Sequence, residues 1–301
     1  MTALAPILQA YFTERLAQRQ ASPHTVGSYR DTFCLLLRFA QQRLSKLPST
    51  LDVTDIDASF VGAFLDHLET ERGNCAATRN NRLAAVHSLF SYAALRCPEH
   101  AATIGRVLAI PTKRTDTSVV CFLTRTEVDA LLASPDRATQ AGRRDHALLL
   151  VAIQTGLRVS ELTGLTCGDV TLGVGANLRC QGKGRKQRHT PMTRPTAQVL
   201  RDWLTERRGD PTNTLFPNRK GGRLSPDAVA DLLAKHVTTA AGRCPSLKAK
   251  RISPHTLRHT AAMTLLHAGI DTSTIALWLG PPTSSQPPDL QTPQPKSANP
   301  A

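Results

Sequence analysis

Four side chains that can donate a hydrogen bond or a proton to a phosphate lie in three short motifs. Arg158 lies in TGLRVSEL, Lys183 lies in QGKGRKQRHTPM, and His255 and Arg258 share SPHTLRHT. A guanidinium group binds phosphate through two parallel hydrogen bonds, and histidine and lysine can transfer protons. These residue types indicate a site for a phosphate group, provided that the fold brings the three motifs together.

Arg158 follows a stretch of sequence that predicts burial. The residues from Ala147 to Ile153 are apolar on all sides, which is typical of a buried helix. An arginine placed directly after such a helix needs a compensating negative charge. Glu161, one helical turn later, could supply that charge, and so could a bound phosphate. The motif alone leaves both interpretations open.

Lys183 lies between two glycines in a segment with β character, residues 167–193. The glycines predict a tight turn at which the backbone can approach a ligand closely. Most of the basic residues nearby have a simpler interpretation, as solvated side chains of a hairpin. Five of them fall within ten positions: Arg179, Lys183, Arg185, Lys186 and Arg188. The segment does not match the phosphate-binding loop GxxxxGKS or GxxxxGKT.

His255 and Arg258 are expected on one face of a helix. Ser253 and Pro254 are typical of an N-cap and a first helical position, so His255 falls in the first turn, where the helix dipole favours anions. The spacing of three residues places Arg258 on the same face. A metal site with His259 lacks an acidic third ligand and an HExxH pattern, so no metal is expected. A histidine that serves only in packing is the alternative for His255.

The first hundred residues have the apolar periodicity of helices. The helical segments are residues 4–18, 24–44, 58–72 and 77–96, and Ser22-Pro23 is a start signal for the second of them. They predict a four-helix domain at residues 1–108. Residues 109–120 are polar and unpatterned, and we interpret them as a linker.

A second domain is predicted at residues 121–280. Thr124 and Glu127 form a capping box at its start, and the buried helix and the β segment follow. Further helices are expected at residues 194–208, 225–241 and 252–280. Seven of the 21 residues in 281–301 are proline, so a disordered tail is predicted there.

Composition points to a polyanionic partner. The chain has 37 Lys and Arg residues against 23 Asp and Glu residues, a net charge of +14. Such a field attracts nucleic acid, although a genome rich in G and C would also favour arginine. No apolar run approaches the roughly 20 residues that span a bilayer, and no signal peptide is evident. Seven cysteines without a CxxC pair favour free thiols in the cytoplasm.

The order TGLRVSEL, GKGRK, HTLRH resembles the tyrosine recombinases, the phage-integrase family that includes the Xer and Cre recombinases. The resemblance covers roughly residues 5–280. It implies a mainly α fold with a small β-sheet, made of an N-terminal four-helix SAM-like core-binding domain and an α+β catalytic domain. It also implies double-stranded DNA as partner, assembly with other recombinase protomers into a tetramer, and no metal or other cofactor.

The resemblance assigns a role to each candidate residue. Arg158 and Arg258 would bind the non-bridging oxygens of the scissile phosphate, and Lys183 would protonate the departing 5′ oxygen. His255 would bind the phosphate or assist deprotonation of the nucleophile. In the family a tyrosine attacks the phosphate and forms a covalent 3′-phosphotyrosyl link.

The sequence departs from the family pattern after WLG. The family places His or Trp next and tyrosine nine residues later, where this chain has Pro281 and Leu290. Its tyrosines are Tyr11, Tyr29 and Tyr92, in the first domain. A truncation or frameshift is the interpretation, and the chain is expected not to cleave DNA unaided. The alternatives are a DNA-binding or interfering subunit without chemistry, and a partner for a protein that supplies tyrosine in trans.

Overall fold

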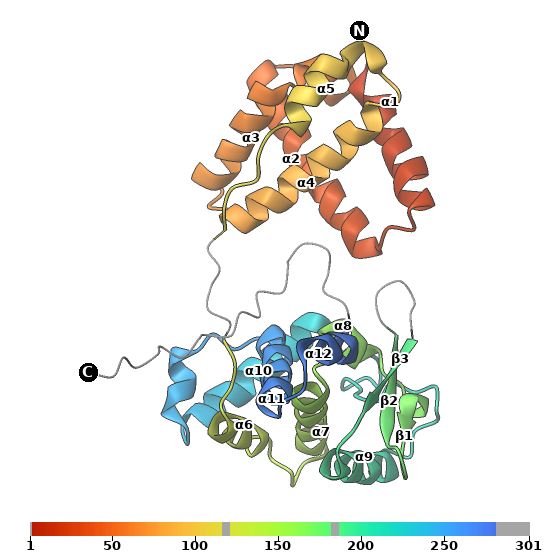
Figure 1. Ribbon diagram of the computed structural model, residues 1–301, viewed down its shortest axis with the longest axis vertical. Coiled ribbons are helices and arrows are strands. Elements are labelled where there is room, and N and C mark those ends of the chain that lie inside the picture. The colour runs from red at the N-terminus through yellow and green to blue at the C-terminus, as the bar shows by residue number, and fades with distance from the viewer. Residues whose placement is uncertain (1, 116–120, 182–186, 281–301) are drawn as a thin grey trace, which may run out of the picture. The chain divides into compact units, whose positions relative to one another are not determined.

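The computed structural model of the chain describes residues 2–115, 121–181 and 187–280. The chain divides into two compact units, Met1–Ser118 and Val119–Ala301. Figure 1 shows that the first unit is built from helices and that the second combines helices with a small sheet. The predicted fold class, mainly helical with a small β-sheet, is confirmed.

The four helices predicted in the first unit are all present, and the structure adds a fifth. Helix α5 has only eight residues and buries Ile104 and Val107, too short a pattern to stand out in the sequence. The elements are α1 (Leu4–Ala10), a π-helix η1 (Tyr11–Leu16), α2 (Pro23–Leu44), α3 (Ala58–Thr70), α4 (Ala76–Ala93) and α5 (Ala101–Leu108), with short 3-10 helices at Pro48–Thr50, Val53–Asp55 and Pro98–His100.

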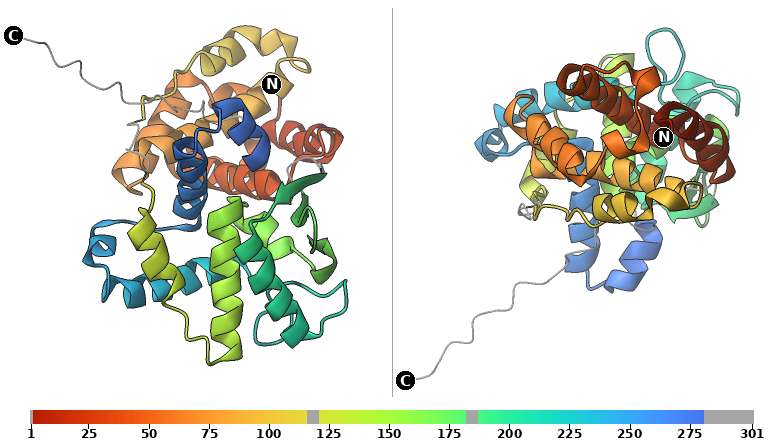
Figure 2. Two further views of the ribbon diagram at one scale, coloured as in Figure 1. Left: turned by 60° about the horizontal axis from the view of Figure 1, so that its bottom comes forward. Right: turned by 90° about the horizontal axis from the view of Figure 1, so that it is seen from above.

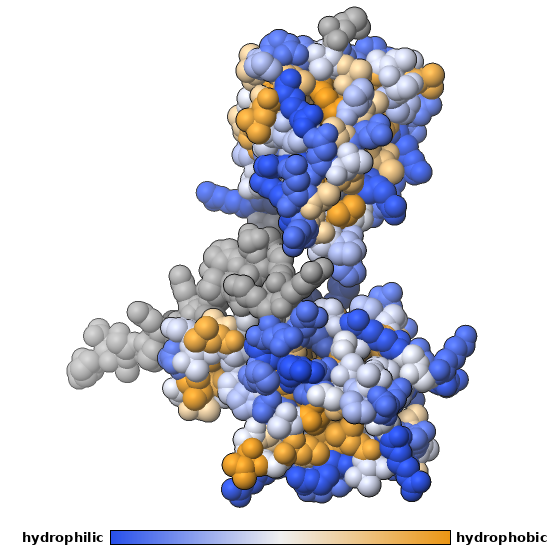
Figure 3. Space-filling model, turned by 90° about the vertical axis from the view of Figure 1, so that its right-hand side faces the viewer, coloured by the Kyte–Doolittle hydropathy of each residue, from blue (hydrophilic) through white to orange (hydrophobic). Residues whose placement is uncertain are grey.

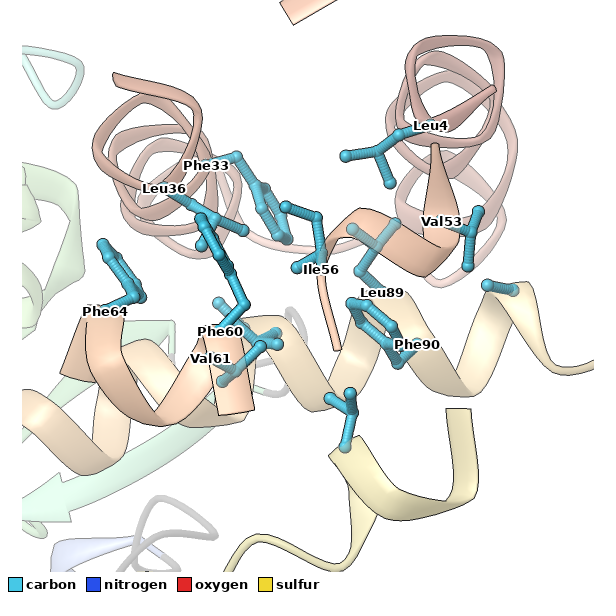
Figure 4. Close-up of a cluster of buried hydrophobic side chains, with 14 of the residues drawn as sticks. Leu4, Phe33, Leu36, Val53, Ile56, Phe60, Val61, Phe64, Leu89 and Phe90 are labelled. Atoms are coloured by element: carbon cyan, nitrogen blue, oxygen red, sulfur yellow. The ribbon is translucent and has the colours of Figure 1, made fainter. Parts of the chain in front are cut away.

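Side chains from α2, α3 and α4 fill the core of the first unit. Phe33, Phe64 and Phe90 come from these three helices and are 3%, 0% and 1% exposed. Figure 4 shows such side chains pointing into one shared core. The register of α2 is fixed at its start, where the Ser22 hydroxyl accepts a hydrogen bond from the main-chain N–H of Thr25.

Part of the predicted linker is tied to the first unit. The side-chain amide of Asn80 in α4 pairs with both main-chain groups of Lys113, at 3.0 Å from its N–H and 2.8 Å from its carbonyl. The Lys113 ammonium lies 2.6 Å from the Glu69 carboxylate of α3. Residues near 113 therefore follow the surface of α3 and α4.

The second unit is organised around α7, which contacts α6 and α9 on either side and packs against α11 (Figures 1 and 2). Its apolar stretch is buried, as predicted; Leu148, Leu149 and Val151 are each 0% exposed. The helices are α6 (Arg125–Leu132), α7 (Gln140–Thr155), α8 (Val159–Gly164), α9 (Arg194–Arg207), α10 (Pro226–Ala241), α11 (Pro254–His267) and α12 (Thr272–Leu279), with 3-10 helices at Cys167–Asp169 and Pro245–Ala249 (η7).

Three antiparallel strands form the sheet of the second unit. They are β1 (Val170–Thr171), β2 (Asn177–Gln181) and β3 (Gln187–Pro191), in the order β1-β2-β3. Cys180 of β2 is paired with Arg188 of β3, so both side chains point to the same face of the sheet. Cys180 is buried, and Arg188 therefore points inward, unlike an ordinary basic residue of a hairpin.

Gly156, directly after α7, allows three helices to meet. Its φ of +63° lies in the left-handed region, and a Cβ there would come within 2.5 Å of the Leu279 side chain and 3.0 Å of the Ala261 side chain. The ends of α7 and α12 and the middle of α11 can pack this closely only around a glycine. Among the described residues, no helix is long and apolar enough to cross a membrane.

Candidate phosphate-binding site

Arg158 is the N-cap residue of α8 and faces the carboxylate of Glu161. Its main-chain N–H donates to Glu161 Oε2 at 2.8 Å, and its Nη1 lies 3.1 Å from Oε1. The Arg158 side chain is 21% exposed, whereas that of Glu161 is 4% exposed. The ion pair that the sequence left open as an alternative is present. It does not exclude a phosphate, because a guanidinium group has five N–H donors.

A second arginine shares the same carboxylate. Arg188 donates from Nη1 to Glu161 Oε1 at 3.0 Å and from Nη2 to Oε2 at 2.8 Å, the paired geometry of an arginine fork. Burial alone would raise the pKa of Glu161, but the hydrogen bonds from Arg188 and from the Arg158 main chain outweigh it and lower the pKa. Glu161 is therefore ionised at neutral pH.

Arg258 comes from α11, one turn after His255, and binds main-chain carbonyl groups. Its Nη1 donates to the Gly156 carbonyl at 2.7 Å and its Nη2 to the Leu279 carbonyl at 2.8 Å. Burial, together with the nearby positive charge of Arg158, lowers the pKa of Arg258 to about 10, and Glu161 opposes this shift. The side chain still carries its charge at neutral pH.

The end of α12 lies against the arginines. Gly280 has a φ of +80°, and a Cβ there would lie 3.1 Å from Arg188 Nη1 and 3.5 Å from Arg158 Nη1. Arg258 donates to the carbonyl of the preceding residue. Arg158, Arg188 and Arg258, which are far apart in the sequence, thus meet around one carboxylate and one short piece of main chain.

The structure describes His255 but not Lys183, the other two candidate residues. His255 is exposed in the first turn of α11, where the Ser253-Pro254 start signal puts it. Lys183 lies outside the described residues, which resume at Gln187. Among the described residues, no group of three His, Cys, Asp or Glu side chains could hold a metal ion.

The sequence pattern does not reveal the part that Arg188 plays in this cluster, because it groups Arg188 with the solvated basic residues of a hairpin. The signal that could have found it is the alternation of β3. The side chains of Gln187 and His189 are exposed, whereas Arg188 is half-buried and Thr190 is 1% exposed. An inward arginine on a short strand needs an internal anion, and Glu161 provides it.

The three tyrosines belong to the packing of the first unit. Tyr11 is 0% exposed and donates to Ser88 Oγ at 2.7 Å, and Tyr29 stacks on its ring. Tyr92 is 6% exposed and donates to Glu14 Oε2 at 3.1 Å. Burial raises the pKa of Tyr11 above its usual value, which disfavours the phenolate.

Both units match models of known families. The model described as "Phage integrase family" matches residues 121–281. The model described as "Phage integrase, N-terminal SAM-like domain" matches residues 8–96. Together they account for most of the described residues.

Individual proteins give the same result. The chain is 57% identical over 279 residues to the y4rC protein of Sinorhizobium fredii, which is named as an integrase/recombinase; the match covers 92% of this chain and 84% of that protein. It is 31% identical over 282 residues to the tyrosine recombinase XerC of Pelobacter propionicus, covering 93% and 88%. A lambda integrase dimer bound to a core site has the same fold, with a TM-score of 0.67, 18% identity and coverage of 95% and 97%.

Proposed function

Because the chain belongs to the phage integrase family of tyrosine recombinases, we propose that it binds duplex DNA, holds one DNA phosphate in the arginine cluster, and does not attach itself covalently to DNA when alone. The observation that carries the proposal is the meeting of Arg158 and Arg258 at the end of α12. Two guanidinium groups that converge on one place are suited to the non-bridging oxygens of a phosphate.

Each site residue has a separate task when another protomer supplies the attacking tyrosine in trans. Arg158 and Arg258 neutralise the charge that develops on the phosphate, so no metal ion is required. Lys183 is the general acid for the departing 5′ oxygen. His255, at the exposed start of α11, donates a hydrogen bond to the phosphate or accepts a proton from the attacking hydroxyl.

The proposed lack of covalent attachment rests on the tyrosines of this chain. Tyr11 and Tyr92 are buried and hydrogen-bonded in the first unit, and Tyr29 is stacked there. The arginines can stabilise a transition state, but they cannot replace an attacking hydroxyl. Loss of the nucleophile in a hydrolase costs on the order of 10⁶ in rate.

A covalent-trapping experiment tests the proposal. Duplexes that the chain binds are selected from a random library and rebuilt with a nick beside each phosphate in turn, which traps a covalent intermediate. We expect stable complexes but no adduct that survives denaturation. A family member that carries the expected tyrosine, assayed on its own site, is the positive control.

Three outcomes would change the proposed function. Absence of any complex with duplex DNA would remove the DNA-binding part of it. An adduct formed by this chain alone, with the phosphate mapped by mass spectrometry to Tyr11, Tyr29 or Tyr92, would overturn the part concerning cleavage. An adduct formed on this chain's site only after addition of the tyrosine-bearing relative would instead indicate that tyrosine is supplied in trans.

A further inference from the structure

We propose that Arg188 is a positioning residue of the phosphate site: by neutralising Glu161, it leaves Arg158 with the charge and orientation needed to bind phosphate. The inference rests on the proposed function, because it assumes that Arg158 and Arg258 bind a phosphate. Arg188 itself is assigned no contact with the reacting atoms.

The hydrogen bonds to Glu161 support this role. A carboxylate offers about four lone-pair positions. Arg188 fills two of them, and the main-chain N–H and Nη1 of Arg158 fill two others. The carboxylate is therefore saturated and held in one orientation, and the Arg158 side chain is aligned on it.

The charges of the cluster also favour this role for Arg188. Arg158, Arg188 and Glu161 together carry one net positive charge, to which Arg258 adds another. Without Arg188, the buried carboxylate would have Arg158 as its remaining cationic partner, and that pair would be neutral. A phosphate would then face one uncompensated guanidinium group in place of two, in a site where burial strengthens electrostatic interactions.

From its position on β3, Arg188 also connects the sheet to α8 and to the end of α12. The strand pairs with β2 in the core of the second unit, while the Arg188 guanidinium reaches Glu161 of α8 and lies next to Gly280 at the end of α12. One side chain thus joins the sheet to two of the elements that build the cluster. A lysine could carry the charge but could not form the paired fork.

Arg179 offers a matched control on the neighbouring strand. It also pairs with a carboxylate, at 3.0 Å from Asp169 Oδ1, but its side chain is 50% exposed. The Asp169 carboxylate also accepts hydrogen bonds from Thr166, so the pair serves a turn and not the arginine cluster.

Inorganic phosphate is the probe, titrated at constant ionic strength into the full chain. The side-chain Nε–H signals of Arg158 and Arg258 report binding by NMR. We expect Arg188→Met to weaken the apparent phosphate affinity about five- to tenfold, within the range of couplings between residues that share partners. Arg179→Met should change it less than about twofold.

A rescue variant separates positioning from loss of structure. Glu161→Gln in the Arg188→Met background removes the carboxylate that would neutralise Arg158, so the affinity should recover toward that of the wild type. Phosphate affinity is compared only among variants that urea denaturation shows to be fully folded, because removing an unpaired buried carboxylate would also restore stability. If Arg188→Met does not fold, Arg188→Lys decides the matter, because the inference requires its affinity to fall below that of the wild type.

The phosphate site and the positioning role of Arg188 are tested separately by these variants. If Arg158→Met and Arg258→Met leave phosphate binding unchanged, the proposed site itself is wrong. If those variants weaken binding but Arg188→Met behaves like Arg179→Met, or the double variant shows no recovery, the site stands and the positioning role of Arg188 is wrong.

Discussion

Gly280 lies at the end of α12, where a side chain would meet the guanidinium groups of Arg188 and Arg158. Its φ of +80° and ψ of 150° are essentially confined to glycine. The nearest guanidinium group, that of Arg188, is fixed by two hydrogen bonds to Glu161 and cannot move aside without loosening them. The residue thus meets a conformational and a steric requirement at once.

We expect Gly280→Ala to lower the free energy of unfolding by about 1–3 kcal/mol, the usual cost of such a backbone conformation, and more if Arg188 is displaced. Urea denaturation measures the change. Gly269→Ala is a control for positive φ alone: Gly269 has a φ of +79°, but no atom lies within 4 Å of the position of its Cβ. Equal losses in the two variants would show that contact with the arginines contributes nothing.

The sequence predicts the site role of some residues but not of others. Arg158 and Arg258 stood out because each lies in a compact motif beside a helix start or a buried helix. Arg188 did not, because its importance depends on a cross-strand pairing with Cys180 and on a carboxylate 27 positions earlier. Pairings of that kind are set by tertiary structure, and local pattern does not reveal them.

At the scale of elements, Glu127 of α6 forms a partly buried ion pair with Lys250, the residue that follows η7. Glu127, 2% exposed, accepts a hydrogen bond from Lys250 at 2.6 Å and another from Ser246 at 2.7 Å. Burial alone would raise the pKa of Glu127, but these hydrogen bonds, with that from the Thr124 main chain, outweigh it and lower the pKa to about 2. The same carboxylate completes the capping box of α6.

Acid should therefore weaken this connection. The pKa falls from 4.5 in the unfolded chain to about 2 in the folded chain, so the stabilisation is complete above pH 4.5 and is lost as the pH falls toward 2. We expect the unfolding free energies of the wild type and Glu127→Gln to converge by about 3 kcal/mol over that range. Urea denaturation at several pH values measures both.

Asp129→Asn is the control for the Glu127 variant. Asp129 lies on the same helix, and its ion pair with Arg125 is exposed, so it contributes little at any pH. A stability difference between the wild type and Glu127→Gln that stays constant from pH 5 to pH 2 would contradict the assigned shift.

Element prediction succeeded where local signals were strong. Ser22-Pro23, the Thr124–Glu127 capping box and Ser253-Pro254 all mark real helix starts. The sequence pattern does not predict helix α5, because a segment of eight residues with two buried positions does not define a period. The attachment of Lys113 to Asn80 was also missed, since a side-chain amide that pairs with a distant main chain leaves no periodic trace.

At the scale of the whole molecule, charge is distributed unevenly between the units. The second unit has 24 basic and 13 acidic residues, an excess of 11, whereas the first has 13 and 10, an excess of 3. Figure 3 shows that hydrophilic residues cover much of the visible face of each unit, with apolar residues in smaller patches. Electrostatic attraction to DNA should therefore come mainly from the second unit.

Within that unit, α9 lies at the opposite end from α8 and α12 (Figure 1). Arg194 and Arg201 of α9 are exposed, so they provide a charge-matched comparison with Arg158 and Arg258. Substituting either pair with methionine removes two positive charges. Only Arg158 and Arg258 belong to the proposed phosphate site.

We expect the affinity of the full chain for duplex DNA to fall steeply with salt, because each phosphate that it neutralises releases counterions and adds about −0.9 to the slope of log K against log salt concentration. Fluorescence anisotropy from 50 to 200 mM salt measures this slope. The Arg158→Met/Arg258→Met variant should have a slope shallower by about 1, since a contact with one phosphate is lost. The Arg194→Met/Arg201→Met variant should keep the wild-type slope.

Two results would contradict this expectation. If both variants change the slope equally, binding depends on net charge alone. If the wild type shows no salt dependence, the basic surface is not a DNA-binding surface.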